Sequence, residues 1–173
     1  EVNYVIGNKE KTDKIFWKKF LSKKKEDNNT IVVSDIMKLK ETSHYLLNNF
    51  DKKTRCFLQI QNGCDHRCTF CIIPFGRGNS RSIKVENILT NIRFALEKEV
   101  KEIVLTGVDL TSWGSDFLEK QSLGNLLKTI FKEIPELPRL RVSSLDPAEI
   151  DYDFMDVLES QENLMPHLHL SIQ

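Results

Sequence analysis

Residues 56–71, CFLQIQNGCDHRCTFC, join a predicted β-strand directly to three closely spaced cysteines. Cys64, Cys68 and Cys71 follow the strand in a C-x3-C-x2-C pattern. Gly63 opens the loop and further Gly and Pro residues follow it, so the chain can curl its sulfurs toward one point. Because no secretory leader is evident, disulfides are not expected. Thiolates gathered this closely instead suit a soft metal centre.

Two kinds of metal centre compete for this pattern, and thiols without a metal are a third interpretation. A structural zinc site needs a fourth ligand, which Cys56 or His66 could supply. However, Cys56 is expected to point away from the loop, and His66 lies inside the tight repeat. A 4Fe–4S cluster normally takes four cysteines, so three would leave one iron open to a substrate or cofactor. The spacing favours this open cluster.

Strands and helices alternate through the rest of the chain. Strands are predicted at Cys56–Gln61, Glu102–Thr106, Leu140–Ser143 and His167–Gln173. Helices are predicted over 85–96, Leu123–Ile134 and Ile150–Leu158. This order predicts an α/β fold with right-handed crossovers and a parallel sheet. Four such strands cannot close a barrel, so we expect a partial barrel, with more strands beyond Gln173.

Three of these four strands alternate apolar and polar residues. In the last strand the apolar face consists of Leu168, Leu170 and Ile172. Its polar face consists of His167, His169, Ser171 and Gln173. Helices would cover the apolar faces, so the polar faces would line a wet or liganded interior, as in (β/α) barrel enzymes. A sheet face simply exposed to water is the alternative.

The first 55 residues predict a separate unit. Strands are expected at Val2–Ile6 and Ile31–Val33, with a helix over Thr12–Ser22 between them. The polar stretch Lys38–Lys53 is expected to be a linker. We therefore place the end of one α/β domain at residues 1–48 and the start of a second at 49–173. The chain begins with Glu rather than Met, and we expect an internal piece of a longer protein.

The composition is that of an ordinary globular protein. The 173 residues carry 25 Lys and Arg and 25 Asp and Glu, and 40% are hydrophobic. These values argue against disorder, collagen and a disulfide mini-protein, and no apolar run is long enough to span a membrane. Residues 1–55 hold 13 of the basic and 8 of the acidic residues. That surplus does not by itself indicate nucleic-acid binding. A cytoplasmic location is expected.

Several stretches together resemble radical S-adenosylmethionine (SAM) enzymes. C-x3-C-x-aromatic-C after the first strand of a βα array is the signature of that superfamily. Four stretches are similar to its methylthiotransferase branch: QNGCDHRCTFCIIPFGRGNSRS (61–82), IVLTGVDLTSWG (103–114), RLRVSSLDP (139–147) and HLHLSIQ (167–173). The short R-G-x-S-R-S spacing most resembles the bacterial transferases that act on threonylcarbamoyladenosine in tRNA.

The resemblance implies a radical-SAM partial barrel and assigns roles to particular residues. Cys64, Cys68 and Cys71 would hold a 4Fe–4S cluster whose free iron binds SAM. No acid–base catalytic residue is implied. The candidate SAM contacts are Phe70, Gly107, Asp109, Ser144, Ser171 and Gln173. Basic residues after the cysteines would meet phosphate or the substrate's carboxylate: Arg77, Arg81 and Lys84.

The resemblance also implies a transferase that methylthiolates C2 of N6-threonylcarbamoyladenosine next to the anticodon. Its partners would be the tRNA anticodon loop and a reducing protein such as flavodoxin or ferredoxin. A second 4Fe–4S cluster would lie in an N-terminal region upstream, so this piece alone is expected to be inactive. Cys56 matches no ligand position and is expected to be a buried strand residue. Alternatives are the same chemistry on isopentenyladenosine or a ribosomal protein, or a zinc-stabilised RNA-binding module.

Overall fold

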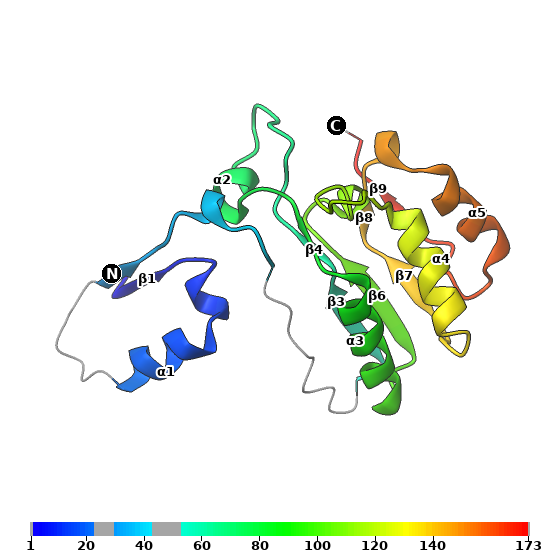
Figure 1. The fold of residues 1–173 in the computed structure, drawn as a ribbon, viewed down its shortest axis with the longest axis horizontal. Coiled ribbons are helices and arrows are strands. Elements are labelled where there is room, and N and C mark those ends of the chain that lie inside the picture. The colour runs from blue at the N-terminus through cyan, green and yellow to red at the C-terminus, as the bar shows by residue number, and fades with distance from the viewer. Residues whose placement is uncertain (1, 23–29, 43–52, 173) are drawn as a thin grey trace.

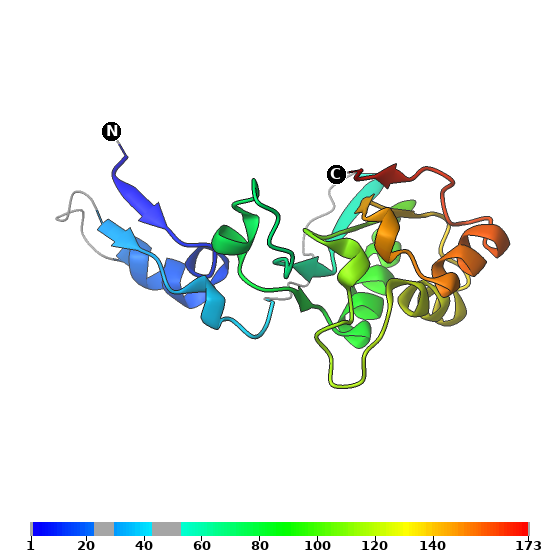
Figure 2. The same cartoon turned by 90° about the horizontal axis from the view of Figure 1, so that it is seen from above.

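The computed structural model describes residues 2–22, 30–42 and 53–172 of the chain. A small unit lies at one end and a larger sheet with its helices at the other, with helix α2 (Ile73–Arg77) between them (Figures 1 and 2). The small unit contains β1 (Tyr4–Ile6), α1 (Lys14–Ser22) and β2 (Thr30–Val32), and the two strands are parallel. The predicted strands and helix of this unit are therefore confirmed.

The larger part is built on a parallel three-stranded sheet of order β3-β6-β7. These strands are β3 (Arg55–Gln59), β6 (Glu102–Thr106) and β7 (Leu140–Val142). Helix α3 (Val85–Glu97) connects β3 to β6, and α4 (Leu123–Glu133) connects β6 to β7. The predicted α/β class and parallel order are confirmed. Each helix forms where apolar residues recur at helical spacing, because these residues make an apolar stripe that packs on the sheet.

The core lies between the sheet and its helices. Residues in register across parallel strands share a face, and two such rows are fully or almost fully buried. The rows are Cys56–Ile103–Leu140 and Leu58–Leu105–Val142. On the opposite face Phe57 and Gln59 are exposed and Arg141 is half-buried. The predicted separation into an apolar and a more polar face therefore holds for β3 and β7.

The last predicted strand differs from expectation. Helix α5 (Tyr152–Ser160) leads to β9 (His169–Leu170), which pairs in parallel with the two-residue strand β8 (Ser144–Leu145). Leu170 is 41% exposed and Ile172 is 89% exposed. The prediction of a buried apolar face is therefore wrong for Leu170 and Ile172, whereas Leu168 packs against the core.

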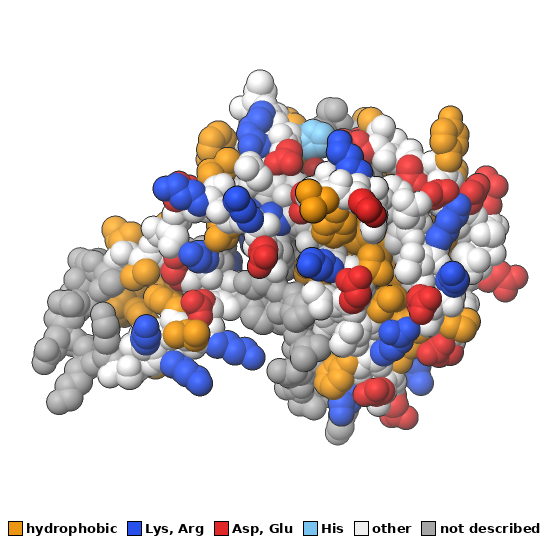
Figure 3. All heavy atoms as spheres, viewed as in Figure 1, with side chains coloured by type: hydrophobic (Ala, Val, Ile, Leu, Met, Phe, Trp, Pro, Cys, Tyr) orange, Lys and Arg blue, Asp and Glu red, His pale blue; other side chains and the backbone are white. Residues whose placement is uncertain are grey.

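The remaining elements are short. Strands β4 (Gln61–Asn62) and β5 (Arg81–Ser82) pair antiparallel on either side of the cysteine loop. The 3-10 helices are Glu10–Thr12, Ile36–Lys38, Leu110–Ser112 and Pro147–Glu149. Over the described ranges, every helix is too short or too polar to cross a lipid bilayer. Acidic and basic side chains are interspersed on the face in Figure 3, as the balanced charge suggests.

Candidate metal and cofactor site

The cysteine loop is closed at its neck by backbone contacts. Gly63 has φ +80°, and a Cβ there would lie 1.9 Å from the carbonyl oxygen of Asn79. The Cys64 N–H donates to the Gly78 carbonyl at 3.1 Å. Any side chain at Gly63 would force the two sides of the neck apart. The glycine turn predicted here is confirmed, and the structure adds its steric reason.

Side chains between the cysteines fold the loop back on itself. Arg67 donates to the Cys64 carbonyl at 2.9 Å and to the side-chain oxygen of Asn79 at 2.9 Å. Asp65 accepts from the Ser80 N–H at 3.0 Å. These polar residues of the repeat therefore hold the loop together through contacts with its backbone and with Asn79.

The three loop cysteines are free thiols of graded exposure. Cys64 and Cys71 are half-buried and Cys68 is exposed. Burial raises the pKa of Cys64 to about 11; the His66 N–H opposes this, while Asp109 and Cys71 add to it. The thiol therefore keeps its proton until a metal displaces it.

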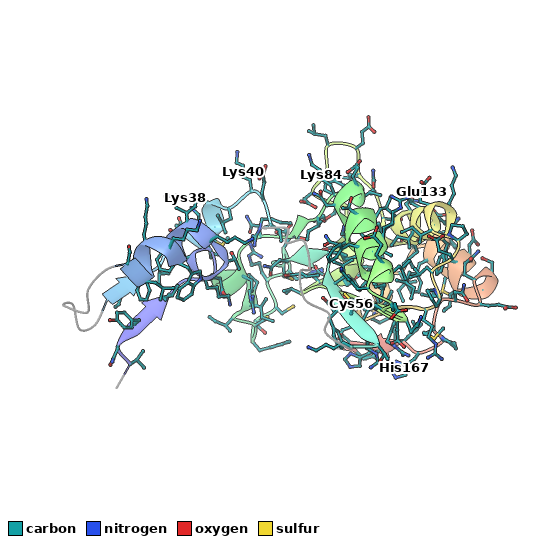
Figure 4. All side chains as sticks on the ribbon, turned by 90° about the horizontal axis from the view of Figure 1, so that it is seen from below. Lys38, Lys40, Cys56, Lys84, Glu133 and His167 are labelled. Atoms are coloured by element: carbon teal, nitrogen blue, oxygen red, sulfur yellow. The ribbon has the colours of Figure 1, made fainter. Side chains whose placement is uncertain are left out.

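Cys56 is separate from this loop. It lies on β3, is 3% exposed, and packs in the core between sheet and helices (Figure 4). Burial raises the pKa of its thiol to about 11. The expectation that Cys56 is a buried strand residue is confirmed.

A cluster of polar side chains surrounds Cys64. His66 Nε2 lies 3.4 Å from Asp109 Oδ2 and 3.2 Å from Glu149 Oε1. The Cys64 thiol donates to Asp109 Oδ2 at 3.6 Å. Sequence reasoning missed the contact between His66 and Glu149, because the two residues are far apart in the chain and only the fold joins them.

The same geometry bears on the choice between zinc and a cluster. Among the described residues, one group of side chains could hold a metal ion: His66, Asp109 and Glu149. Their possible ligand atoms all lie within 4.8 Å of one another. None of the four described cysteines belongs to that group. A mononuclear zinc ion needs its ligands to meet at one point, whereas a cubane takes each cysteine on a separate iron. The three thiols, gathered in one loop without converging on one atom, fit a cubane better.

The candidate SAM contacts lie at the carboxyl ends of the parallel strands. Gly107 and Asp109 follow β6, Ser144 begins β8 after β7, and Ser171 follows β9. Phe70, inside the cysteine loop, is 75% exposed. Gln173 lies outside the described residues. Strand ends of this kind are where α/β enzymes bind ligands, so the fold brings the described candidates to the expected edge.

Several of these candidates already have protein partners. The Ser144 hydroxyl lies 2.7 Å from His169 Nδ1, and the Ser171 N–H donates to the Leu145 carbonyl at 2.9 Å. A Cβ at Gly107 would lie 2.9 Å from an oxygen of the Gln61 side chain. Contact with Gln61 thus explains this glycine without a ligand.

The structure corrects two sequence expectations near the loop. Arg81 was expected to meet phosphate or a carboxylate, but it is 4% exposed and donates to the carbonyls of Arg77 and Asn79. It holds the loop rather than facing solvent. Gln61, on the polar face of the first predicted strand, was expected to face a wet or liganded interior, but it is fully buried. The alternation of apolar and polar residues assigns a polar side chain to one face of a strand. It does not show whether that side chain will hydrogen-bond to water or to protein backbone.

A parallel α/β sheet with three free thiols at the carboxyl edge of its first strand defines a class of metal- and cofactor-binding fold. The sequence model of the radical SAM superfamily matches residues 58–173. The chain belongs to the radical SAM superfamily, as its cysteine pattern led us to expect.

Three relatives that this chain is similar to are named as tRNA-modifying enzymes. Threonylcarbamoyladenosine tRNA methylthiotransferase MtaB of Rickettsia prowazekii is 44% identical over 173 residues, 100% of this chain and 39% of that protein. The protein of the same name from Aquifex aeolicus is 33% identical over 174 residues, covering 100% of this chain and 41% of that protein. The tRNA-2-methylthio-N(6)-dimethylallyladenosine synthase of Shouchella clausii is 36% identical over 121 residues, 70% of this chain and 23% of that protein. The chain thus spans about two fifths of the first two relatives.

Proposed function

We propose that this protein is a radical SAM transferase that methylthiolates C2 of N6-threonylcarbamoyladenosine in tRNA, next to the anticodon. One observation carries the proposal. A loop with three free thiols stands at the ligand-binding edge of a chain that is similar, along its whole length, to proteins named for that reaction. The shorter match to a dimethylallyladenosine synthase makes that base the second candidate substrate. A ribosomal protein remains a further alternative target.

The proposed cofactors are a 4Fe–4S cluster and SAM. Cys64, Cys68 and Cys71 would hold the cluster, which leaves one iron without a protein ligand for SAM. When bound, such a cluster supplies the electron for reductive SAM cleavage, the radical chemistry needed to remove hydrogen from an unactivated aromatic carbon. The chain's own contribution is to hold the three sulfurs in one loop, whose neck is closed at Gly63.

The surrounding side chains would bind and orient SAM. Phe70 would pack beside the adenine, where its exposed ring is available. Asp109 would accept a hydrogen bond from the SAM ammonium once metal binding at Cys64 has released the thiol proton to solvent. Ser144 and Ser171 would supply further polar contacts, as would Gln173.

The proposed partners are the tRNA anticodon loop and a reducing protein such as flavodoxin or ferredoxin. A base in a single-stranded loop can be unstacked to reach the strand ends at a lower cost in free energy than a paired base in a duplex. We place the protein in the cytoplasm because its proposed substrate is there. A second 4Fe–4S cluster, bound outside this chain, belongs to the same proposal, as does the assignment of residues 1–48 and 49–173 to two domains.

Nucleoside mass spectrometry tests the substrate. We expect tRNA from a strain without the gene to lack the 2-methylthio form of threonylcarbamoyladenosine and to accumulate the unmethylthiolated base. Loss of the 2-methylthio form of the dimethylallyl base instead would transfer the assignment to the second candidate. If both bases are unchanged, the tRNA assignment is wrong.

Cysteine variants of the full-length protein test the cofactor. After anaerobic reconstitution, Cys68→Ala is expected to lose one cluster's share of iron and sulfide and all formation of 5′-deoxyadenosine from SAM. Cys56→Ala is the matched control, because it removes a thiol of the same chain that lies in the core. It should retain iron and SAM cleavage. Zinc without iron in the wild-type protein would favour the zinc-stabilised RNA-binding module and contradict the enzyme assignment.

A further inference from the structure

A buried carboxamide joins the cysteine loop to the turn after β6. Gln61 is 0% exposed, and its Nε2 donates to the Gly63 carbonyl at 2.7 Å and to the Ser80 hydroxyl at 2.9 Å. Its Oε1 accepts the N–H groups of Val108 and Asp109, both at 2.9 Å. A carboxamide has two N–H donors and two acceptor lone pairs. All four are used by protein groups, although this face of the strand was expected to be wet or liganded.

Two hydroxyl groups complete a ring of hydrogen bonds with Gln61. The Ser112 hydroxyl donates to the Asp109 carbonyl at 3.0 Å and lies 3.1 Å from the Ser80 hydroxyl. Since the Ser112 proton is committed to Asp109, Ser80 must donate to Ser112 and accept from Gln61. The ring returns to Gln61 through the Asp109 N–H. It permits one orientation of the Gln61 amide, with nitrogen toward the cysteine loop and oxygen toward the β6 turn.

This ring joins the start of the cysteine loop to the turn after β6. The first segment carries Cys64, and the second carries Asp109. Gly63 immediately precedes Cys64, and the Asp109 side chain accepts from the Cys64 thiol. Gly107 leaves room for the carboxamide, since a Cβ there would lie 2.9 Å from Gln61 Oε1. Gln61 thus fixes the backbone on both sides of the pair formed by Cys64 and Asp109.

We propose that Gln61 is a positioning residue for SAM: its carboxamide holds the cysteine loop and the Val108–Asp109 turn at the separation that lets one SAM molecule reach both. The inference rests on the proposed function, in which the cysteines hold a SAM-binding cluster. Gln61 touches neither cluster nor SAM and acts through the two backbone segments. Residues that orient metal ligands in this indirect way typically change affinity or activity by about 10- to 100-fold when replaced.

The test compares Gln61→Glu with wild type in the full-length, anaerobically reconstituted protein. Glutamate keeps the shape of the side chain but loses the two N–H donors to Gly63 and Ser80. We expect iron and sulfide contents to stay at the wild-type level and the dissociation constant for SAM to rise about tenfold or more. The change that SAM causes in the electron paramagnetic resonance spectrum of the reduced cluster should weaken in parallel. Gln161→Glu is the control, because it makes the same substitution at an exposed glutamine just after α5.

Each outcome has a distinct meaning. If wild type contains iron but neither binds nor cleaves SAM, the proposed function fails. If wild type binds SAM and Gln61→Glu binds it equally well at normal iron content, only the positioning role is overturned. If Gln61→Glu assembles no cluster, Ser80→Ala decides: weaker SAM binding at normal iron content supports the role, and unchanged binding refutes it. Equal losses in Gln161→Glu and Gln61→Glu would also refute it.

Discussion

Phe70 is an aromatic side chain that the fold leaves in water. It lies between two proposed cluster ligands, and three quarters of it is exposed. Ile72 and Phe75, which follow the loop, are exposed as well. Large apolar side chains gain free energy from burial, so an exposed group of them beside polar strand ends is typical of a ligand or partner surface. Among the three, only Phe70 lies within the cysteine repeat.

We predict that Phe70→Ala weakens SAM binding with little change in stability. The exposed ring contributes little to the core, whereas a packed aromatic contact contributes about 0.5–1.5 kcal/mol, or roughly a 2- to 10-fold rise in the dissociation constant. Equilibrium binding of SAM to the reconstituted full-length protein, with a thermal melt, measures both quantities. Phe75→Ala removes a similarly exposed ring outside the repeat. An equal loss of SAM affinity in the two variants would show that Phe70 has no special contact.

Residue patterns predicted some side chains of this site and missed others for a physical reason. The cysteines and Gly63 were found because metal ligation and tight turns restrict the residue type and the spacing. The contacts of Gln61 and Glu149 were not found, because their partners are distant backbone or side-chain atoms. Such contacts leave no periodic trace in the sequence.

At the scale of secondary structure, one carboxylate ties together the three strands of the main sheet. Glu102 begins β6 and its Oε1 accepts from Arg55 of β3 at 2.9 Å and from Arg141 of β7 at 2.8 Å. Burial by itself would raise the Glu102 pKa, but hydrogen bonds and charges from Arg141 and Arg55 outweigh it, so the pKa is lowered from 4.5. The parallel register pairs Arg55 with Glu102, but it pairs Arg141 with Val104, so register predicts only the first of the two contacts.

We predict that Glu102→Gln lowers the free energy of unfolding by about 2 kcal/mol at pH 7, because it leaves Arg141 and Arg55 without a charged partner. Because the pKa is lowered on folding, there is a pH range in which the carboxylate is charged in the folded state but protonated in the unfolded state. The stabilisation is therefore complete above pH 4.5 and is lost as pH falls through the lower, folded-state pKa.

Urea unfolding of wild type and variant from about pH 3 to about pH 7 measures this effect, and their difference should shrink at the acid end. Glu133→Gln is the matched control. Glu133 lies at the end of α4 (Figure 4), and its side chain and that of its partner Arg93 are both about half exposed. That substitution should cost less than about 1 kcal/mol. A difference between wild type and Glu102→Gln that stays constant with pH would contradict the assignment.

Short elements were harder to predict than long ones. Periodicity found α3 and α4, which bury an apolar stripe over 13 and 11 residues. It did not find α2, whose five residues include Pro74 and Gly76, both read as loop signals. Contacts with the N-terminal unit hold this helix, so its stability is tertiary and not local.

At the scale of the whole molecule, the N-terminal unit braces the far side of the cysteine loop. Asn8 donates a hydrogen bond to the Gly76 carbonyl in α2. The 3-10 helix Ile36–Lys38 packs against the same helix. Gly78, at the end of α2, has φ +81°, and a Cβ there would lie 2.7 Å from the Ile36 carbonyl oxygen. The two units therefore meet at the loop that would hold the cluster. The predicted boundary at 48/49 lies outside the described residues and stays a prediction.

This junction makes two neighbouring glycines inequivalent. Gly78→Ala must place a Cβ at a positive φ and against the Ile36 carbonyl, so we predict a loss of about 1–3 kcal/mol in the free energy of unfolding. Gly76→Ala meets nothing within 4 Å and lies inside α2, where alanine is the better helix former. It should be neutral or stabilising by up to about 1 kcal/mol.

Hydrogen exchange then distinguishes a loosened junction from a general loss of stability. The amides of Lys38 and Leu39 close the 3-10 helix, and in Gly78→Ala they should exchange faster. The exchange rates of the β6 amides should rise only as much as the loss in the global free energy of unfolding requires. Equal acceleration in both places would mean that Gly78 supports the whole fold and not the contact between units. Equal free energies of unfolding and equal exchange rates in the two alanine variants would mean that the N-terminal unit does not pack against the cysteine loop. In that case the loop's geometry would depend on contacts within the larger unit, including those of Gln61, and not on the N-terminal unit.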